Sequence, residues 1–321
     1  MGNPDKIVAV GLGEVLYDHD VVTDEYTFGG APANFADHFL KCSRLISGPD
    51  AAEVHVVSAV GDDERGRAVS AELEARGLCD GLCRVGELPT GVVDKRRDAA
   101  GVNAYEILPG AWDAMTWSDA LARLAARTDV VCFGSLAQRS AASHATVVRF
   151  LDGVIRRERP TLRVFDVNLR QDFFSREVLE ESMTRCNILK ISDEEAEFLW
   201  GITDEEKAAE KLQKEFGVKL SMVTMGPRGA YLSNEKAAAR AVCPRVTPVD
   251  TTGAGDIFGG SAVAWLLKSG KAPEELDEKE LAAMGAFASA AASLSTEMPG
   301  GIPSIPSEEA VRKKLRGSEA I

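Results

Sequence analysis

The chain has few aromatic residues, an excess of negative charge and no long apolar segment. Aromatic residues make up 6% of its 321 residues, and 50 acidic residues face 37 basic ones, for a net charge of −13. Proteins that neutralise nucleic-acid phosphates normally need a basic face, so nucleic acid is not an expected partner. No apolar run approaches the roughly 20 residues that span a bilayer. The polar start at residues 1–6 is not followed by an apolar signal segment. We therefore expect no membrane partner and a cytoplasmic location.

Paired cysteines and two common phosphate-binding motifs are also missing. The six cysteines are scattered, which suits reduced thiols in the cytosol better than a disulfide framework. Cys79 and Cys83 are four residues apart, but no second ligand pair accompanies them, and structural zinc sites need four ligands. A dinucleotide-binding fingerprint would need glycine where Leu16 stands, and no P-loop sequence occurs.

Short apolar segments alternate with amphipathic segments of helical length. The expected strands are residues 7–11, 54–60, 130–133, 163–167, 188–191 and 220–224. The expected helices are residues 68–76, 117–126, 142–156, 176–185, 205–216 and 308–316. This alternation predicts an α/β protein with a mostly parallel sheet that is covered by helices on both faces. We expect residues 1–321 to form a single domain.

Two stretches break the alternation. Residues 21–28 and 91–108 look like strands without an intervening helix, and 98–101 is the expected turn within the second stretch. We expect these strands to form a small β lid over one edge of the main sheet. Its segments would be inserted at about residues 15–33 and 89–110.

The most informative segment reads Asp-Thr-Thr-Gly-Ala-Gly-Asp and precedes an apolar, helix-like stretch at 257–267. A helix N-terminus presents unpaired N–H groups and a partial positive charge. Gly253, Ala254 and Gly255 would let a phosphate approach that backbone closely. Asp256, in the first helical turn, could accept the proton of an attacking hydroxyl. The simpler alternative is that Asp256 only complements the helix dipole and the glycines only form a turn.

This string resembles the C-terminal signature of the ribokinase-like (PfkB) family of carbohydrate kinases. Near the N-terminus, Gly-Gly-Ala-Pro-Ala-Asn-Phe-Ala at 29–36 is similar to a second signature of that family, and Gly-Asp-Asp-Glu-Arg-Gly at 61–66 is similar to a family turn. The resemblance covers residues 10–306. It implies a ribokinase-like three-layer α/β/α sandwich with a β lid. It also implies an ATP-dependent kinase that transfers the γ-phosphoryl group to a sugar hydroxyl, with Asp256 as the base and Gly253–Gly255 as the anion hole.

The same resemblance assigns further roles. The implied sugar-binding residues are Asp18, Gly30, Asn34 and Arg170. The implied nucleotide-binding residues are Lys190, Thr224, Gly226 and Gly229. The implied metal-binding residues are Asn168 and Glu195 for Mg²⁺, largely through water, and Asp250 and Thr252 for K⁺. Three of these have simpler alternatives. Asp18 could be a solvated turn residue, Asn168 could belong to an ordinary polar loop, and Glu195 could form a capping box with Ser192. Glu194 is an adjacent alternative to Glu195 as the acidic residue that serves the metal.

The expected acceptor is fructose. Gly-Glu-Val-Leu-Tyr-Asp at 13–18 and the signature at 29–36 look most like those of bacterial fructokinases. The 2-keto-3-deoxygluconate kinases often carry an arginine where Ile107 stands, which argues against an acidic sugar. Ketodeoxy sugar acids, ribose and nucleosides are the alternative substrates, and a catalytically silent sugar sensor is the alternative that is not an enzyme. Because lids of this family often pair across a dimer, a homodimer through the lid is a further candidate.

Overall fold

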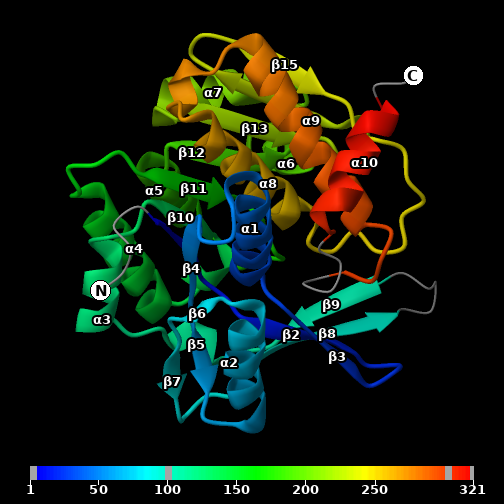
Figure 1. The fold of residues 1–321 in the computed structure, drawn as a ribbon. Coiled ribbons are helices and arrows are strands. Elements are labelled where there is room, and N and C mark those ends of the chain that lie inside the picture. The colour runs from blue at the N-terminus through cyan, green and yellow to red at the C-terminus, as the bar shows by residue number, and fades with distance from the viewer. Residues whose placement is uncertain (1–5, 98–102, 301–305, 319–321) are drawn as a thin grey trace.

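The structure, a computed structural model, describes residues 6–97, 103–300 and 306–318 (Figure 1). Its main sheet has nine strands in the order β15-β14-β13-β12-β11-β10-β1-β4-β6. Their bounds are β1 (Ile7–Leu12), β4 (Ala52–Val57), β6 (Cys79–Asp80), β10 (Val130–Gly134), β11 (Leu162–Asp166), β12 (Ile188–Ser192), β13 (Leu220–Thr224), β14 (Ala230–Asn234) and β15 (Ala238–Ala241). Neighbouring strands run parallel from β13 to β6, whereas β14 is antiparallel to both β13 and β15.

Helices cover both faces of this sheet (Figure 1). One apolar core, which contains Phe39 and Met284, lies under α1 (Ala31–Ser47), α2 (Glu64–Arg76), α8 (Ala254–Ser269), α9 (Glu278–Ser295) and α10 (Glu308–Ser318). The other, which contains Phe150 and Leu212, lies under α3 (Asp119–Ala125), α4 (Ala141–Ile155), α5 (Arg176–Arg185), α6 (Asp193–Trp200) and α7 (Glu205–Phe216). Short 3-10 helices are η1 (Ala111–Ala114), η2 (Leu136–Gln138), η3 (Gly226–Arg228) and η4 (Pro273–Glu275). The predicted three-layer, ribokinase-like α/β/α architecture is thereby confirmed.

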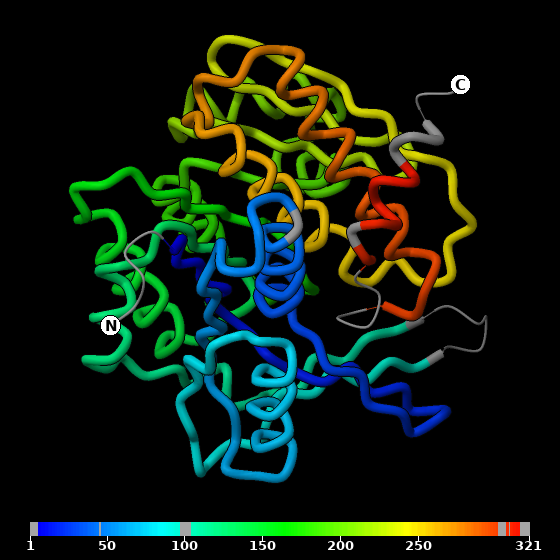
Figure 2. The backbone as a smooth tube through the Cα atoms, viewed as in Figure 1, coloured from blue at the N-terminus to red at the C-terminus, as the bar shows by residue number. Residues whose placement is uncertain are grey.

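A second, four-stranded sheet leaves the main sheet at the carboxyl end of β1. It consists of β2 (Leu16–Asp20), β3 (Glu25–Gly29), β8 (Gly91–Arg97) and β9 (Asn103–Ile107), in the order β3-β2-β8-β9. The chain enters this sheet directly from β1 and returns to the main body through α1 (Figure 2). A short parallel pair, β5 (Ala59–Gly61) and β7 (Cys83–Val85), lies beside it. We call the four-stranded sheet the lid.

Several predicted elements match the structure closely, and two were wrong. The predictions for 176–185, 205–216 and 220–224 coincide with α5, α7 and β13. Residues 54–60 are not one strand, because the chain breaks at Ser58 between β4 and β5. Residues 21–28 are not one strand either, because Asp20 accepts the N–H groups of Val22 and Thr23 and turns the chain there. The predicted turn at 98–101 lies outside the described residues.

The absences predicted from the sequence can be compared with the described part of the chain. All six cysteines lie within it, and none of them forms a disulfide. In the same part of the chain, no helix combines the length and apolarity that a membrane crossing requires.

Candidate active site

The N-terminus of α8 forms the centre of the site. Gly253 is its N-cap, in a left-handed conformation with φ 79°, and no side chain caps the helix. The Ala254 N–H group turns back to the carbonyl of Thr251, at 3.2 Å. The next N–H groups of the first turn have no acceptor within the helix. The sequence Gly-Ala-Gly therefore leaves a bare, positively polarised helix end, as the anion-hole prediction requires.

Asp256 lies in the first turn of α8 and is buried, with 9% of its surface exposed. Its Oδ2 accepts a hydrogen bond from Nδ2 of Asn34, at 2.8 Å. Burial and the like charge of Asp166 raise the pKa of Asp256 to about 7, against the opposing effects of Asn34 and Lys190. A carboxylate whose pKa is near neutral is well matched to general-base work.

Asp18 and Asn34 converge above Gly29, the last residue of β3. A Cβ atom added to Gly29 would lie 3.4 Å from Oδ2 of Asp18 and 3.8 Å from Oδ1 of Asn34. Burial raises the pKa of Asp18 to about 6, and the charge of Asp250 adds to that rise, while Lys95 opposes it. Asp18, Gly29 and Asn34 form a polar floor. This floor is next to Asp256, because Asn34 donates a hydrogen bond to that carboxylate.

Gly30 has a mainly structural task. It has a φ of 112° and is the N-cap of α1, and a Cβ atom there would lie 2.4 Å from the carbonyl oxygen of Glu14. Only glycine lets the end of β1 and the start of α1 approach this closely. Gly30 therefore shapes the floor.

Two buried polar atoms at this floor have no partner among the described residues. They are Oε2 of Glu14 and Oδ1 of Asn34. Glu14 is 2% exposed, and burial together with the charges of Asp256 and Asp166 raises its pKa to about 7. Buried polar atoms are normally satisfied, so these two indicate places for a bound water or a ligand hydroxyl. The sequence analysis assigned no role to Glu14, although a carboxylate just after a buried strand was its visible signal.

Lys190 lies beneath the N-terminus of α8. Its Nζ is bound by both carboxylate oxygens of Asp166, at 2.7 and 2.8 Å, and both residues are buried. A Cβ atom on Gly255 would come within 3.0 Å of this Nζ. Burial alone would lower the pKa of Lys190, but the charges of Asp166 and Glu195 outweigh burial and raise it. The ammonium group is therefore a fixed positive charge under the first turn of α8.

Glu195, rather than Glu194, holds the loop that contains Asn168. One Glu195 oxygen accepts the N–H of Leu169 and the other accepts the N–H of Ser192, both at 2.8 Å. Ser192 Oγ in turn accepts the N–H of Glu195, so the capping box is present. Glu194 is exposed on α6.

Asn168 and Arg170 lie on that same loop. Asn168 has a φ of 43°, which directs the chain sharply away from β11. Arg170 is exposed, and its Nη1 donates to the carbonyl of Leu169 at 3.1 Å. Its positive charge lowers the pKa values of Glu14, Asp18 and Asp256. Arg170 is therefore close enough to the floor to stabilise negative charge there.

Asp250 connects the loop before α8 to the lid. Its Oδ1 accepts the N–H of Thr252 at 2.9 Å, and its Oδ2 accepts the N–H of Gly300 at 3.2 Å. Lys95, on lid strand β8, places its Nζ 3.7 Å from Oδ2 of Asp250. Lys95 could not be identified from the sequence, because nothing in the local sequence shows that β8 reaches this loop.

The predicted nucleotide-binding turn follows the neighbouring strand of the sheet. Thr224 ends β13, opposite Ser192, and its Oγ1 donates to the carbonyl of Ile191 at 3.4 Å. A Cβ atom on Gly229 would lie 1.9 Å from the carbonyl oxygen of Ala241, so packing explains that glycine. Gly226, with a φ of 53°, faces open space. The predicted base, sugar-binding and anion-hole residues thus lie around the N-terminus of α8. The predicted nucleotide-binding residues lie farther along the same edge of the sheet.

Comparisons with known proteins give the family. The model of the pfkB family carbohydrate kinases matches residues 10–308. Fructokinase-1 of Zea mays is 32% identical over 293 residues, which cover 88% of this chain and 86% of that protein. Fructokinase-1 of Oryza sativa subsp. japonica is 30% identical over 302 residues, which cover 90% of this chain and 88% of that protein.

Solved structures share the fold. The fructokinase of Xylella fastidiosa with bound ATP has a TM-score of 0.81 at 18% identity, and covers 99% of this chain and 100% of its own. The fructokinase of Vibrio cholerae O395 with fructose, ADP and calcium ion has a TM-score of 0.80 at 22% identity, and covers 97% of this chain and 99% of its own. With the family model and the 32% identical relative, these findings show that the chain belongs to the pfkB family of carbohydrate kinases.

Proposed function

We propose that this sugar kinase is a fructokinase, which transfers the γ-phosphoryl group of ATP to a fructose hydroxyl. The observation that best supports this proposal is the buried Asp256 at the N-terminus of α8. Asn34 connects it by a hydrogen bond to the polar floor that also contains Asp18. Its fructokinase relatives and its fructokinase structural neighbours support the choice of fructose as the acceptor.

Different residues would bind the acceptor, take its proton and stabilise the transferred group. Asp18 and the free Oδ1 of Asn34 accept hydrogen bonds from sugar hydroxyls and orient the acceptor. Asn34 Nδ2 fixes the carboxylate of Asp256, which takes the proton of the reacting hydroxyl as the oxygen–phosphorus bond forms and the bond to the leaving ADP breaks. The N–H groups of the first turn of α8 hold the charge of the transferred group, with Lys190 beneath them.

Oxygen donors near this turn suit a magnesium ion. Asn168 and Glu195 offer the hard oxygen ligands that Mg²⁺ prefers. Because both Glu195 oxygens already accept backbone N–H groups, its remaining lone pairs would reach the ion through water. Bound Mg²⁺ would neutralise negative charge on the nucleotide phosphates. Thr224 and Gly226 border the open part of the sheet edge where the nucleotide would lie.

A panel of acceptors tests the proposal. With MgATP, we expect the highest kcat/KM for fructose, ahead of ribose, 2-keto-3-deoxygluconate and adenosine. Asp18→Asn should raise the fructose KM by about tenfold or more, because a buried charged hydrogen bond is lost. It should leave the ATP KM nearly unchanged. A nucleoside or an acidic sugar as the best acceptor would overturn the fructose assignment and leave the kinase assignment standing.

The pH profile should show the raised pKa of Asp256. The base works only when ionised, and its pKa in the free enzyme is about 7. We therefore expect kcat/KM to fall about tenfold per pH unit below pH 7 and to level off above it. Glu14 titrates in the same range, so Glu14→Gln separates the two carboxyls. If the acidic limb vanishes in Glu14→Gln but the plateau rate persists, Glu14 and not Asp256 sets the profile.

The dependence of the rate on a monovalent cation is a third test. We propose that Asp250 and Thr252 hold K⁺ behind the phosphate-binding turn. Hydrogen bonds from Thr252 and Gly300, and the charge of Lys95, keep the pKa of Asp250 low although burial opposes them. An ionised carboxylate is thus present. Rates should rise when K⁺ replaces a large organic cation at constant ionic strength, and equal rates would contradict the proposal.

We further propose that two lids pair to form a homodimer. The β2–β3 turn, β3 and β9 expose apolar side chains, with exposed fractions of 75% for Val22, 40% for Tyr26 and 43% for Tyr105. Exposed apolar clusters on a sheet commonly mark an interface. Light scattering of the wild type and of Val22→Asp would show a dimer that the substitution weakens. A monomeric wild type would exclude this interface.

A further inference from the structure

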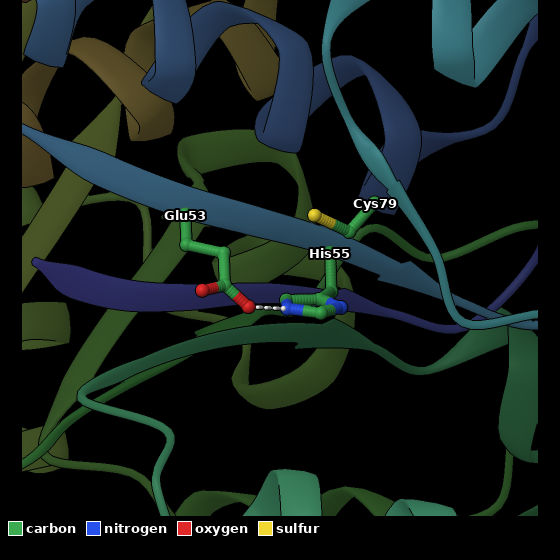
Figure 3. Close-up of side chains that lie close together, drawn as sticks. All are labelled: Glu53, His55 and Cys79. Atoms are coloured by element: carbon green, nitrogen blue, oxygen red, sulfur yellow. Dashed lines mark hydrogen bonds and ion pairs between the residues drawn. The ribbon is translucent and has the colours of Figure 1, made fainter. Parts of the chain in front are cut away.

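Three potential metal ligands of different chemistry meet on one face of the main sheet, away from the kinase site. Glu53 and His55 are two residues apart on β4, so their side chains point to the same face. Cys79 on β6 pairs directly with His55, which places its thiol on that face too. Figure 3 shows the three side chains together, and one ligand atom from each lies within 4.8 Å of the others. We call them the edge cluster.

The hydrogen bonds of the edge cluster compete for one nitrogen atom. Nε2 of His55 lies 2.6 Å from Oε1 of Glu53 (Figure 3). The same nitrogen lies 3.1 Å from Nη2 of Arg127. The guanidinium of Arg127 also contacts Oε1 of Glu53. A ring nitrogen that donates to Glu53 cannot also accept from Arg127, so a neutral His55 leaves one of these contacts unsatisfied. A metal ion in the place of Arg127 would bind the lone pair of His55 Nε2 and a carboxylate oxygen of Glu53 together, and would leave neither group unsatisfied.

The protonation states at neutral pH suit a metal. The hydrogen bond from Arg127 lowers the pKa of Glu53 to about 2, so this carboxylate is ionised. Burial lowers the pKa of His55, so its imidazole is neutral and has a free lone pair. Burial raises the pKa of the Cys79 thiol, which therefore keeps its proton until a metal displaces it.

A cavity reaches the edge cluster at His55. Its volume is about 560 Å³, and it lies between the β4–β6 edge of the sheet and α3, with His55, Asp80, Cys83, Leu124 and Arg127 in its wall. Arg127 has 46% of its side chain exposed, so it can leave the cluster without breaking the core. The cavity also has room for a water molecule as a fourth ligand.

We propose that Glu53, His55 and Cys79 bind one zinc ion, with Arg127 neutralising Glu53 when the ion is absent. Sulfur, nitrogen and carboxylate donors together are typical of zinc sites, whereas Mg²⁺ takes oxygen ligands. Zinc bonds of about 2.0–2.3 Å require donors roughly 3.5 Å apart, so small side-chain rotations complete the site. Binding releases the Cys79 proton to water. Because its ligands come from β4 and β6, the ion cross-links the edge strand to the sheet.

The sequence concealed this site, because the two strands that supply its ligands are separated by α2. The spacing of Cys79 and Cys83 argued against zinc, but the register of β4 and β6 gives Cys79 other partners. Cys83 lies on β7, in the wall of the cavity, and is not part of the edge cluster. It therefore provides a matched control.

The test uses the full chain after treatment with a chelator. We expect calorimetric titration with zinc chloride to show one ion per chain. At about a hundredfold excess over Kd, zinc should raise Tm by roughly 4 °C. Cobalt(II), as a spectroscopic probe, should give a thiolate-to-metal charge-transfer band. Cys79→Ser should lose the band and the Tm shift, Cys83→Ser should keep both, and Arg127→Ala should bind zinc more tightly than the wild type.

Two results would overturn the site. The first is a wild type whose Tm and cobalt spectrum do not respond to the metals. The second is equal loss of the band and of the Tm shift in Cys79→Ser and Cys83→Ser, which would show that the metal is not held by the edge cluster alone. Because neither readout depends on sugar phosphorylation, both results are independent of the fructokinase proposal.

Discussion

Replacement of Asp256 by Asn should lower kcat by about 10²–10⁴-fold and leave the protein folded. Asparagine keeps the shape of the side chain and can still bond to Asn34, but it cannot take the proton of the acceptor hydroxyl. The N–H groups of the first turn of α8 remain, so the Kd for ATP should change much less than kcat. Steady-state rates and nucleotide titration measure the two effects separately.

The pH dependence of stability provides a control for folding. The folded pKa of Asp256 is about 7, above its usual value of 3.8. As pH rises from about 4 to 7, the unfolded chain releases this proton first, so Asp256 makes the wild type progressively less stable in that window. Asp256→Asn should therefore melt higher than the wild type at pH 8, and the difference should vanish near pH 4.

A matched variant separates catalysis from the helix dipole. Asp119 also lies in the first turn of a helix, α3, but it is exposed. Asp119→Asn should lose only about 0.3–1 kcal/mol of stability and none of the activity. If a folded Asp256→Asn retains more than about a tenth of the wild-type kcat, its loss of activity is much smaller than general-base catalysis predicts. Asp256 would then be only a partner of the helix dipole.

Lys190→Met should destabilise the protein by about 3–5 kcal/mol. It leaves the buried carboxylate of Asp166 without the ammonium that binds both of its oxygens. The double variant Asp166→Leu/Lys190→Met removes both charges and should recover most of the loss. Urea unfolding of the single and double variants measures the free energies.

An exposed lysine serves as the control for Lys190. Lys214 pairs with Glu210 on α7 and has 70% of its side chain exposed, so Lys214→Met should change stability by at most about 1 kcal/mol. If Lys190→Met costs no more than Lys214→Met, then Asp166 has another means of compensating its charge. In that case the account of a fixed positive charge under the anion hole would be wrong.

The helix start at the Gly-Ala-Gly-Asp segment could be predicted because its signals are contiguous in sequence. Gly253 is the left-handed N-cap of α8 and Asp256 lies in its first turn, as the local sequence indicates. The same holds for the capping box of Ser192 and Glu195. In both cases a local rule describes the structure, because the partners are at most three residues apart.

The remaining contacts depend on register and burial. Asp166 and Lys190 meet only because β11 and β12 pair directly at these two residues. Lys95 reaches Asp250 across 155 positions of sequence, and no local pattern indicates that contact. Glu14 looks like a turn residue in the sequence, and only the structure shows that it is buried without a partner for Oε2.

The sequence did not predict α1 and α9, and in both cases the reason is their amino-acid composition. α9 is rich in alanine, serine and glycine, and neighbouring elements pack around it, so its faces show little contrast in polarity. α1 begins with Gly-Ala-Pro, which resembles a turn, but proline is well suited to the first turn of a helix. Propensity alone therefore could not identify either helix.

The close packing of α1 against α8 determines which part of the enzyme can change. A Cβ atom on Gly260 would lie 3.1 Å from the carbonyl oxygen of Phe35, and His38 bonds to Ser261 at 2.5 Å. With the hydrogen bond between Asn34 and Asp256, these contacts hold α1 and α8, and with them Asp256, in one packed unit. Asp18 and Gly29 of the floor lie instead on lid strands β2 and β3. Evolution could therefore remodel the lid strands to admit new acceptors without realigning the base, and a lid transplanted from another member of the family should transfer substrate preference while preserving phosphoryl transfer.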